Sequence, residues 1–248
     1  MDIKDFVEIY ECEIEEKLNV SVKVVESIYN ESEQENDALV NEFSRKNIDS
    51  LNGRILFPKS IDGHYKILLN KKIFNGNYNF LCTIFHELTH VWDYTNLFKY
   101  LNIDKVNDAS DYKYFDIFKL WMEFHASLLG ETISYNILQK LSIIEKDNYE
   151  WNKSEELPYM IKYMNEVSKK NENDLGMQLY YFFIYFGKIC FWHDLYPEHY
   201  PRGKVQYLLA NDNRLMKLYD FCNQNRDFFA AINKMEQVRE VLMGDNSD

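Results

Sequence analysis

The stretch Thr83–Tyr94, TIFHELTHVWDY, lies within a run of residues that contains no glycine or proline. Its apolar residues recur at intervals of three and four, the spacing that one face of an α-helix requires. The same spacing continues on both sides, so we predict one long helix over Tyr78–Phe98. The residues around the two histidines of this stretch are apolar, as in a buried helix: Ile84, Phe85, Leu88, Val91 and Trp92.

The sequence before this helix carries strand patterns. Asn19–Ile28 alternates with β-branched residues and predicts a strand. Gly53–Phe57 and His64–Leu69 predict two more, separated by a turn over Pro58–Gly63. Between the first and second strands, the spacing of apolar residues in Ser32–Ser44 predicts a helix.

The sequence after it is helical. Only 8 Gly and 4 Pro occur in 248 residues, which favours long helices with few tight turns. Beyond Pro201 we expect shorter helices, and before it three long ones: Tyr112–Ile144, Pro158–Lys170 and Leu175–Trp192. The predicted fold class is therefore α+β. A small N-terminal mixed sheet packs on the helix that contains HELTH, and a mostly helical C-terminal part follows.

We expect two parts along the chain, a core over residues 1–145 and a helical subdomain over residues 146–248. The acidic, asparagine-rich stretch Lys146–Glu156 marks the predicted boundary. The position of the helical subdomain would suit a cover that closes over a cleft in the core.

Composition and charge exclude several classes of protein. Hydrophobic residues make up 46% of the chain and aromatic residues 16%, which excludes a disordered protein. The formal net charge of −12 offers no basic surface for nucleic acid or an anionic membrane. The first twenty residues lack the pattern of a signal peptide, and the longest apolar stretch, Leu179–Gly187, is shorter than the ~20 residues that span a bilayer. We expect a cytoplasmic protein, with its oligomeric state left open.

The cysteines support the same compartment. Cys12, Cys82, Cys190 and Cys222 are irregularly spaced and form no C-x-x-C pair, so neither a cysteine zinc site nor a redox pair is indicated. We expect reduced, buried thiols, with two disulfides as the alternative.

The central helix contains an H-E-x-x-H pattern. Residues four apart on a helix lie on one face, so the imidazoles of His86 and His90 are expected to point at one spot. Two such nitrogen ligands suit a tetrahedral Zn²⁺ ion. Glu87 is expected to reach a water on that metal as general base without being a ligand. The alternative interpretation is two half-buried histidines on an ordinary helix.

A catalytic zinc ion usually has three protein ligands and one water. The second long helix offers Glu123 as the third, with a plain solvated carboxylate as the alternative. Asp93 and His125 are weaker candidates: Asp93 suits a hydrogen bond to a histidine, and His125 faces about 200° away from Glu123. Small residues follow Glu123 on one face and would let this helix approach the first closely: Ala126, Ser127, Gly130 and Ser134.

The residues around these positions resemble the zincin metallopeptidases, and among them the gluzincin type. HELTHVWDYT is similar to the thermolysin-type active-site helix, and Glu123 in its E-F-x-A setting resembles small bacterial and phage-type metallopeptidases. The resemblance covers about residues 50–135, lacks the metzincin continuation, and leaves the last hundred residues unplaced. It implies a zincin-like catalytic core in which His86, His90 and Glu123 bind zinc and Glu87 is the general base.

The resemblance also implies an edge strand that aligns an extended substrate, for which we select His64–Leu69. A further donor often stabilises the oxyanion in such sites. The loop Phe191–Gly203 gathers polar aromatic residues, and His193 and Tyr196 are the candidates for this catalytic role. His64 itself is expected to be a satisfied edge residue, and the acidic run Glu11–Glu16 a solvated helix face.

The sequence thus predicts a zinc-dependent metallopeptidase with a peptide or protein as substrate. The alternative is a non-catalytic zinc-binding module with a regulatory or interaction role, and a zinc hydrolase of non-peptide amides is a third candidate. Glu87 favours an enzyme, because a structural zinc site needs no base beside its first ligand.

Overall fold

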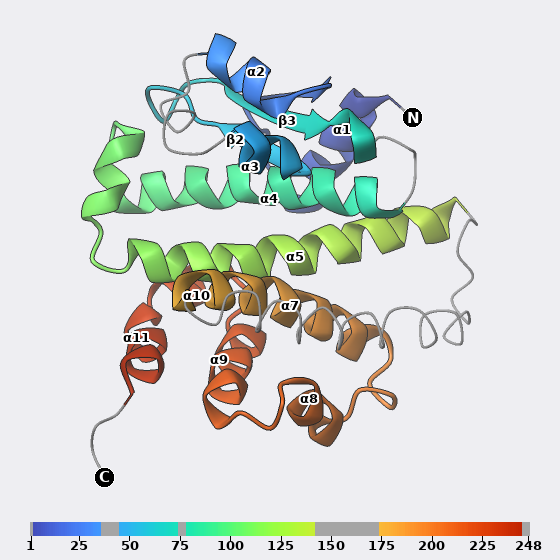
Figure 1. Cartoon of the computed structure of the whole chain (residues 1–248), viewed down its shortest axis with the longest axis vertical. Coiled ribbons are helices and arrows are strands. Elements are labelled where there is room, and N and C mark those ends of the chain that lie inside the picture. Colours follow the sequence, from blue (N-terminus) through green and yellow to red (C-terminus); the bar gives the residue numbers. More distant parts are fainter. Residues whose placement is uncertain (1, 36–44, 74–77, 142–173, 245–248) are drawn as a thin grey trace. The chain divides into compact units, whose positions relative to one another are not determined.

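The computed structural model describes residues 2–35, 45–73, 78–141 and 174–244 (Figure 1). They belong to two compact units, Met1–Lys113 and Tyr114–Asp248, which are described in turn. A small sheet at the N-terminal end followed by helices confirms the predicted α+β class. The predicted boundary Lys146–Glu156, the predicted helix Pro158–Lys170 and most of the predicted helix Ser32–Ser44 lie outside the described residues.

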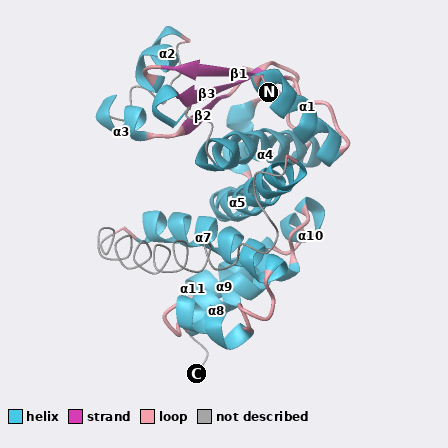
Figure 2. Ribbon diagram, turned by 90° about the vertical axis from the view of Figure 1, so that its right-hand side faces the viewer, coloured by secondary structure: helices cyan, strands magenta, loops and turns pink. Residues whose placement is uncertain are grey.

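The first unit contains a mixed three-stranded sheet, drawn in magenta in Figure 2. Its strands are β1 (Val20–Val25), β2 (Gly53–Leu56) and β3 (Tyr65–Asn70), in the order β1-β3-β2. β1 pairs with β3 in parallel, and β2 pairs with β3 in antiparallel orientation. All three strands were predicted within one to three residues of their observed ends.

Each face of the sheet is covered. Leu68 of β3 belongs to an apolar cluster on one face, together with residues of β1, β2, α2 (Ile28–Gln34) and α3 (Arg45–Ser50). Side chains alternate along a strand, so Ile67 and Leu69 point to the other face. That face packs against α4, which contacts both β2 and β3. The central strand is thereby buried on both sides.

The helix α4 (Tyr78–Leu101) is the predicted central helix, three residues longer than expected. The N-terminal helix α1 (Ile3–Ile14) packs against it: Tyr10 stacks on Phe85 with ring centroids 6.3 Å apart, and its hydroxyl donates to Thr89 Oγ1 at 2.9 Å. Both tyrosine and threonine are buried. Two short 3-10 helices, η2 (Lys71–Ile73) and η3 (Val106–Asp111), precede and follow α4.

The acidic run Glu11–Glu16, which covers the C-terminal end of α1 and the two residues after it, is not only a solvated face. Glu16 accepts a hydrogen bond from the Trp92 indole nitrogen at 3.0 Å and an ion-paired one from Lys99 at 2.5 Å. One carboxylate therefore ties the end of α1 to the C-terminal half of α4.

The second unit is helical. Its longest members are α5 (Phe115–Lys140) and α7 (Leu175–Leu195), which share the largest helix–helix contact of the described chain. Both lie within one to four residues of the predicted helices. Four shorter helices follow, as expected beyond Pro201: α8 (Arg202–Leu208), α9 (Asn213–Gln224), α10 (Phe228–Ile232) and α11 (Met235–Met243).

α5 and α7 approach each other closely at Gly187. A Cβ atom added there would lie 2.5 Å from the carbonyl oxygen of Phe124 and 2.7 Å from Cβ of Ser127. The expected partner of the small residues on α5 was the helix that contains the histidines. Ser127 has a contact with α7, where Gly187 leaves space for it, and the approach of the small residues to the histidine helix stays a prediction.

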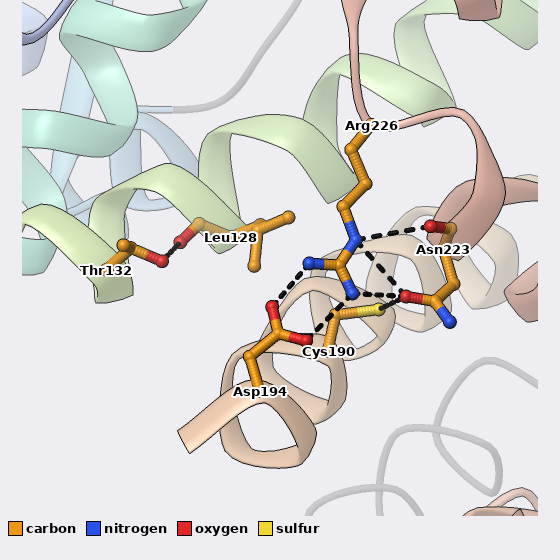
Figure 3. Close-up of polar contacts among 6 residues, drawn as sticks. All are labelled: Leu128, Thr132, Cys190, Asp194, Asn223 and Arg226. Carbon is orange, nitrogen blue, oxygen red and sulfur yellow. Dashed lines mark hydrogen bonds and ion pairs between the residues drawn. The ribbon is translucent and has the colours of Figure 1, made fainter. Parts of the chain in front are cut away.

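Arg226 joins the loop after α9 to the end of α7 (Figure 3). Its guanidinium donates to both carboxylate oxygens of Asp194 and to Oδ1 of Asn223. Cys190 donates to the same Asn223 oxygen at 3.5 Å. Burial raises the pKa of the Cys190 thiol to about 12, so this cysteine is protonated and unreactive at neutral pH.

The cysteines are free, as predicted. Cys190 and Cys222 are buried as expected, whereas Cys12 is exposed and Cys82 partly exposed, so burial was predicted correctly for only two of them. None of the described helices combines the length and the apolar character needed to cross a membrane.

Candidate metal centre

The two histidines of the H-E-x-x-H pattern converge as predicted. Nε2 of His86 lies 3.0 Å from Nε2 of His90, and the ring planes are nearly perpendicular at 89°. Two nitrogens bound at ~2.0–2.1 Å to one tetrahedral zinc ion would lie about 3.3 Å apart. The imidazole pair thus has close to the geometry that a shared metal ion requires.

The surroundings of α4 fix the direction in which the histidines point. Phe85 precedes His86, Leu88 lies between the two histidines, and both apolar residues are fully buried. The hydrogen bond from Tyr10 to Thr89 holds the next residue toward α1. Rotation of α4 would break these contacts, so packing determines the orientation of His86 and of His90, which is 8% exposed.

Glu123 completes a group that could hold a metal ion. One ligand atom from each of His86, His90 and Glu123 lies within 4.8 Å of the other two. Glu123 is half-buried, unlike the fully solvated carboxylate of the alternative interpretation. Two imidazoles and a carboxylate are a donor set that zinc accepts, and that Co²⁺ and Mn²⁺ accept as well.

The two weaker candidates are not members of this group. Asp93 is completely buried. His125 is buried and stacks on Trp121 with ring centroids 4.7 Å apart, which makes it part of the apolar packing of α5.

Glu87 faces a different neighbour from the histidines beside it. A residue on a helix is rotated by about 100° from the one before it. Glu87 consequently points toward β2, where its carboxylate lies against Gly53. Its partial exposure leaves it able to contact a ligand. Glu87 is thus adjacent to His86 in the sequence without being a member of the metal group.

The predicted oxyanion donors have other contacts. Nδ1 of His193 lies 2.9 Å from the carbonyl oxygen of Tyr200, and Tyr196 stacks on Trp192. Both residues lie at the end of α7, and they are not in the metal group. Their role in oxyanion stabilisation stays a prediction that none of these contacts supports.

The prediction that His64–Leu69 forms an edge strand was wrong. His64–Leu69 corresponds to β3, which pairs with β1 on one side and β2 on the other, so its backbone groups are already used. Of the described strands, β1 and β2 form the edges. His64 is satisfied as predicted, since Nδ1 lies 2.8 Å from Oδ1 of Asn19.

Sequence reasoning missed Gly53. A glycine within a strand often marks a close approach by another group, and this signal was present. Its partner Glu87 is 34 residues away in sequence, so the pairing itself could not be read from the pattern.

His86, His90 and Glu123 thus form the candidate metal centre among the described residues. Comparisons with protein-family models, with curated proteins and with solved structures give no match.

Proposed function

We propose that this protein is a zinc-dependent metallopeptidase. The observation that carries the proposal is the position of Glu87, a partly exposed carboxylate next to two convergent imidazoles and outside the metal group. A structural zinc site normally closes with a fourth protein ligand and has no use for such a base.

His86, His90 and Glu123 would hold the metal. Zinc, when bound, supplies Lewis acidity toward a water molecule and a substrate carbonyl. Glu87 accepts the proton of the attacking water and then delivers it to the leaving nitrogen of the peptide bond. Glu87 lies beside β2 and is not a member of the metal group, so it would take part in the proton transfer without being a ligand.

The edge of β2 suits the alignment of an extended peptide. Asn70 N donates to Asn52 O at 2.8 Å, which makes these two residues a hydrogen-bonded antiparallel pair. Such pairs alternate along a strand, so Gly53 and Ile55 direct their backbone groups away from β3. Gly53 is also the residue next to Glu87, which would bring an added strand close to the base.

We further infer a cytoplasmic protein that acts on peptides or proteins rather than nucleic acid. The free state of all four cysteines supports a reducing compartment. The net charge of −12 disfavours binding to nucleic acid or an anionic membrane.

The test is incubation of the purified protein with a mixed peptide library, read by mass spectrometry with and without a chelator. We expect about one zinc per chain by elemental analysis and cleavage that the chelator abolishes and added zinc restores. Zinc without cleavage of any peptide would favour a binding module or a hydrolase of non-peptide amides. Absence of zinc would overturn the proposal.

A further inference from the structure

Gly53 begins β2 on the face of the sheet that packs against α4. It pairs with Leu69, whose side chain points to the same face. Among the described residues, the only glycine with positive φ is Gly244, so the backbone at Gly53 would accept any L-residue. The need for glycine at this position must therefore come from space.

The side chain of Glu87 lies where a side chain at Gly53 would have to begin. An ideal Cβ atom at this position would lie 2.6 Å from Oε1, 2.8 Å from Cγ and 2.9 Å from Cδ of Glu87. Side-chain carbons in proteins do not approach other atoms this closely. The three nearest atoms all belong to Glu87, and no backbone atom is among them.

An added methyl group would consequently have to displace the side chain of Glu87 first. A glutamate end is flexible, so the side chain can turn aside while α4 and β2 stay in place. His86 and His90 point in a different direction from Glu87 and would keep their positions. The substitution would therefore change the location of the Glu87 carboxylate, and it would leave the fold and the two imidazoles as they are.

We infer that Gly53 is a positioning residue for the general base: its missing side chain lets the Glu87 carboxylate lie against β2, beside the histidine pair. This inference rests on the proposed function, in which Glu87 transfers the proton. Backbone pairing between β2 and β3 does not itself require a glycine as the first residue of β2, whereas this role does.

The first test is kinetic. Gly53→Ala is expected to lower kcat at least tenfold, to change KM less than threefold because the backbone groups remain, and to keep one zinc per chain. In a Glu87→Ala background the same substitution should have no further effect on residual hydrolysis. Activity within threefold of the parent, or an equal loss in both backgrounds, would overturn the inference.

The second test needs no activity and uses the metal-free protein. Alanine suits a strand better than glycine. Gly53→Ala should therefore raise the melting temperature when Glu87 is also alanine, and should lower it or leave it unchanged when Glu87 is present. Gly203→Ala is the control: an added Cβ there meets no atom within 4 Å, and its effect should be the same in both backgrounds.

These two tests separate the inference from the proposed function. If no peptide is cleaved, the metallopeptidase proposal fails, while the melting cycle still measures the contact of Gly53 with Glu87. Equal melting shifts for Gly53→Ala in both backgrounds would refute the positioning role even in an active peptidase.

Discussion

Neighbouring residues on α4 meet different surroundings and can therefore have different tasks. The imidazole of His86 faces His90, whereas the carboxylate of Glu87 faces β2. A one-residue step around the helix separates His86, a member of the candidate metal group, from Glu87, which is not a member.

Glu87→Gln is expected to lower kcat by about 10²–10⁴-fold, because the amide cannot accept the proton of the attacking water. Zinc content should be unchanged, since Glu87 is not in the metal group. Initial rates with a cleaved library peptide and elemental analysis of the same sample are the measurements. Full activity in this variant would refute the role of Glu87 as base.

Glu123→Ala is expected to reduce zinc occupancy after dialysis well below one per chain, because only two protein ligands remain. The matched control is Asp116→Ala, which removes a carboxylate of the same helix that is 90% exposed and should leave zinc in place. Zinc retained equally by both variants would show that Glu123 is not a ligand.

Gly53 and Gly187 mark two close approaches of opposite kinds. Gly53 leaves room for a flexible side chain, whereas Gly187 leaves room for backbone atoms of α5. Backbone atoms of a packed helix cannot turn aside. The cost of a methyl group at Gly187 must therefore appear as lost stability.

Gly187→Ala is expected to destabilise the protein by about 1–3 kcal/mol, the usual cost of overpacking. Alanine would otherwise stabilise a helix by about 1 kcal/mol relative to glycine. Gly203→Ala in α8, where the added group meets open space, is expected to follow that propensity instead. Urea unfolding followed by circular dichroism measures both, and equal effects would contradict the tight crossing of α5 and α7.

The pairing of α1 with α4 predicts a pH dependence. The hydrogen bond from Lys99 lowers the pKa of Glu16, partial burial acts against this, and the bond from Trp92 adds to the lowering. Because the folded protein binds the proton less readily than the unfolded chain, the contribution is fully present above the ordinary glutamate value of about 4.3. It is lost as the pH falls through the lowered pKa.

Glu16→Gln should therefore reduce the free energy of unfolding at pH 7 and flatten its decline between about pH 5 and 3 in the metal-free protein. Glu13→Gln, a change at an exposed position of α1, is the control. Urea titrations across this range measure the difference. Identical pH profiles for the two variants would contradict the role of Glu16 as a link between helices.

The sequence predicted which segments are helices and strands better than it predicted where these segments lie in the fold. Tyr78–Phe98 was recognisable because its apolar spacing is unbroken, and α4 follows it closely. The place of β3 within the sheet was missed, because chain order does not give spatial order. The unbroken apolar run Ile67–Leu69 was a signal for a strand buried on both faces.

In the candidate site, too, a local feature was predictable and contacts between distant segments were not. Helical spacing alone predicted that His86 and His90 would converge. The contact of Gly53 with Glu87 depends on the register of β2 and on its packing against α4. Neither can be predicted from a local sequence pattern. The tie from Glu16 to Trp92 is likewise a contact between distant segments that charge patterning could not show.

Metal binding should be visible in the stability of the whole chain. A ligand that binds the folded state at a hundred times its Kd stabilises it by about 2.7 kcal/mol. We expect zinc to raise the melting temperature of the parent protein and to leave that of a His86→Ala, His90→Ala double variant unchanged. Calorimetry with and without added zinc measures this, and an equal rise in both proteins would point to binding elsewhere.

The shortness of β2 has a consequence for what such a peptidase would cut. Four residues, two of which direct their backbone groups outward, can grip only a brief extended segment. A protein substrate would have to break its own backbone hydrogen bonds over that segment before cleavage. The choice of substrate would then depend more on the local flexibility of a polypeptide than on its amino-acid sequence. Frayed chain ends and unfolded chains would be cleaved before well-folded proteins.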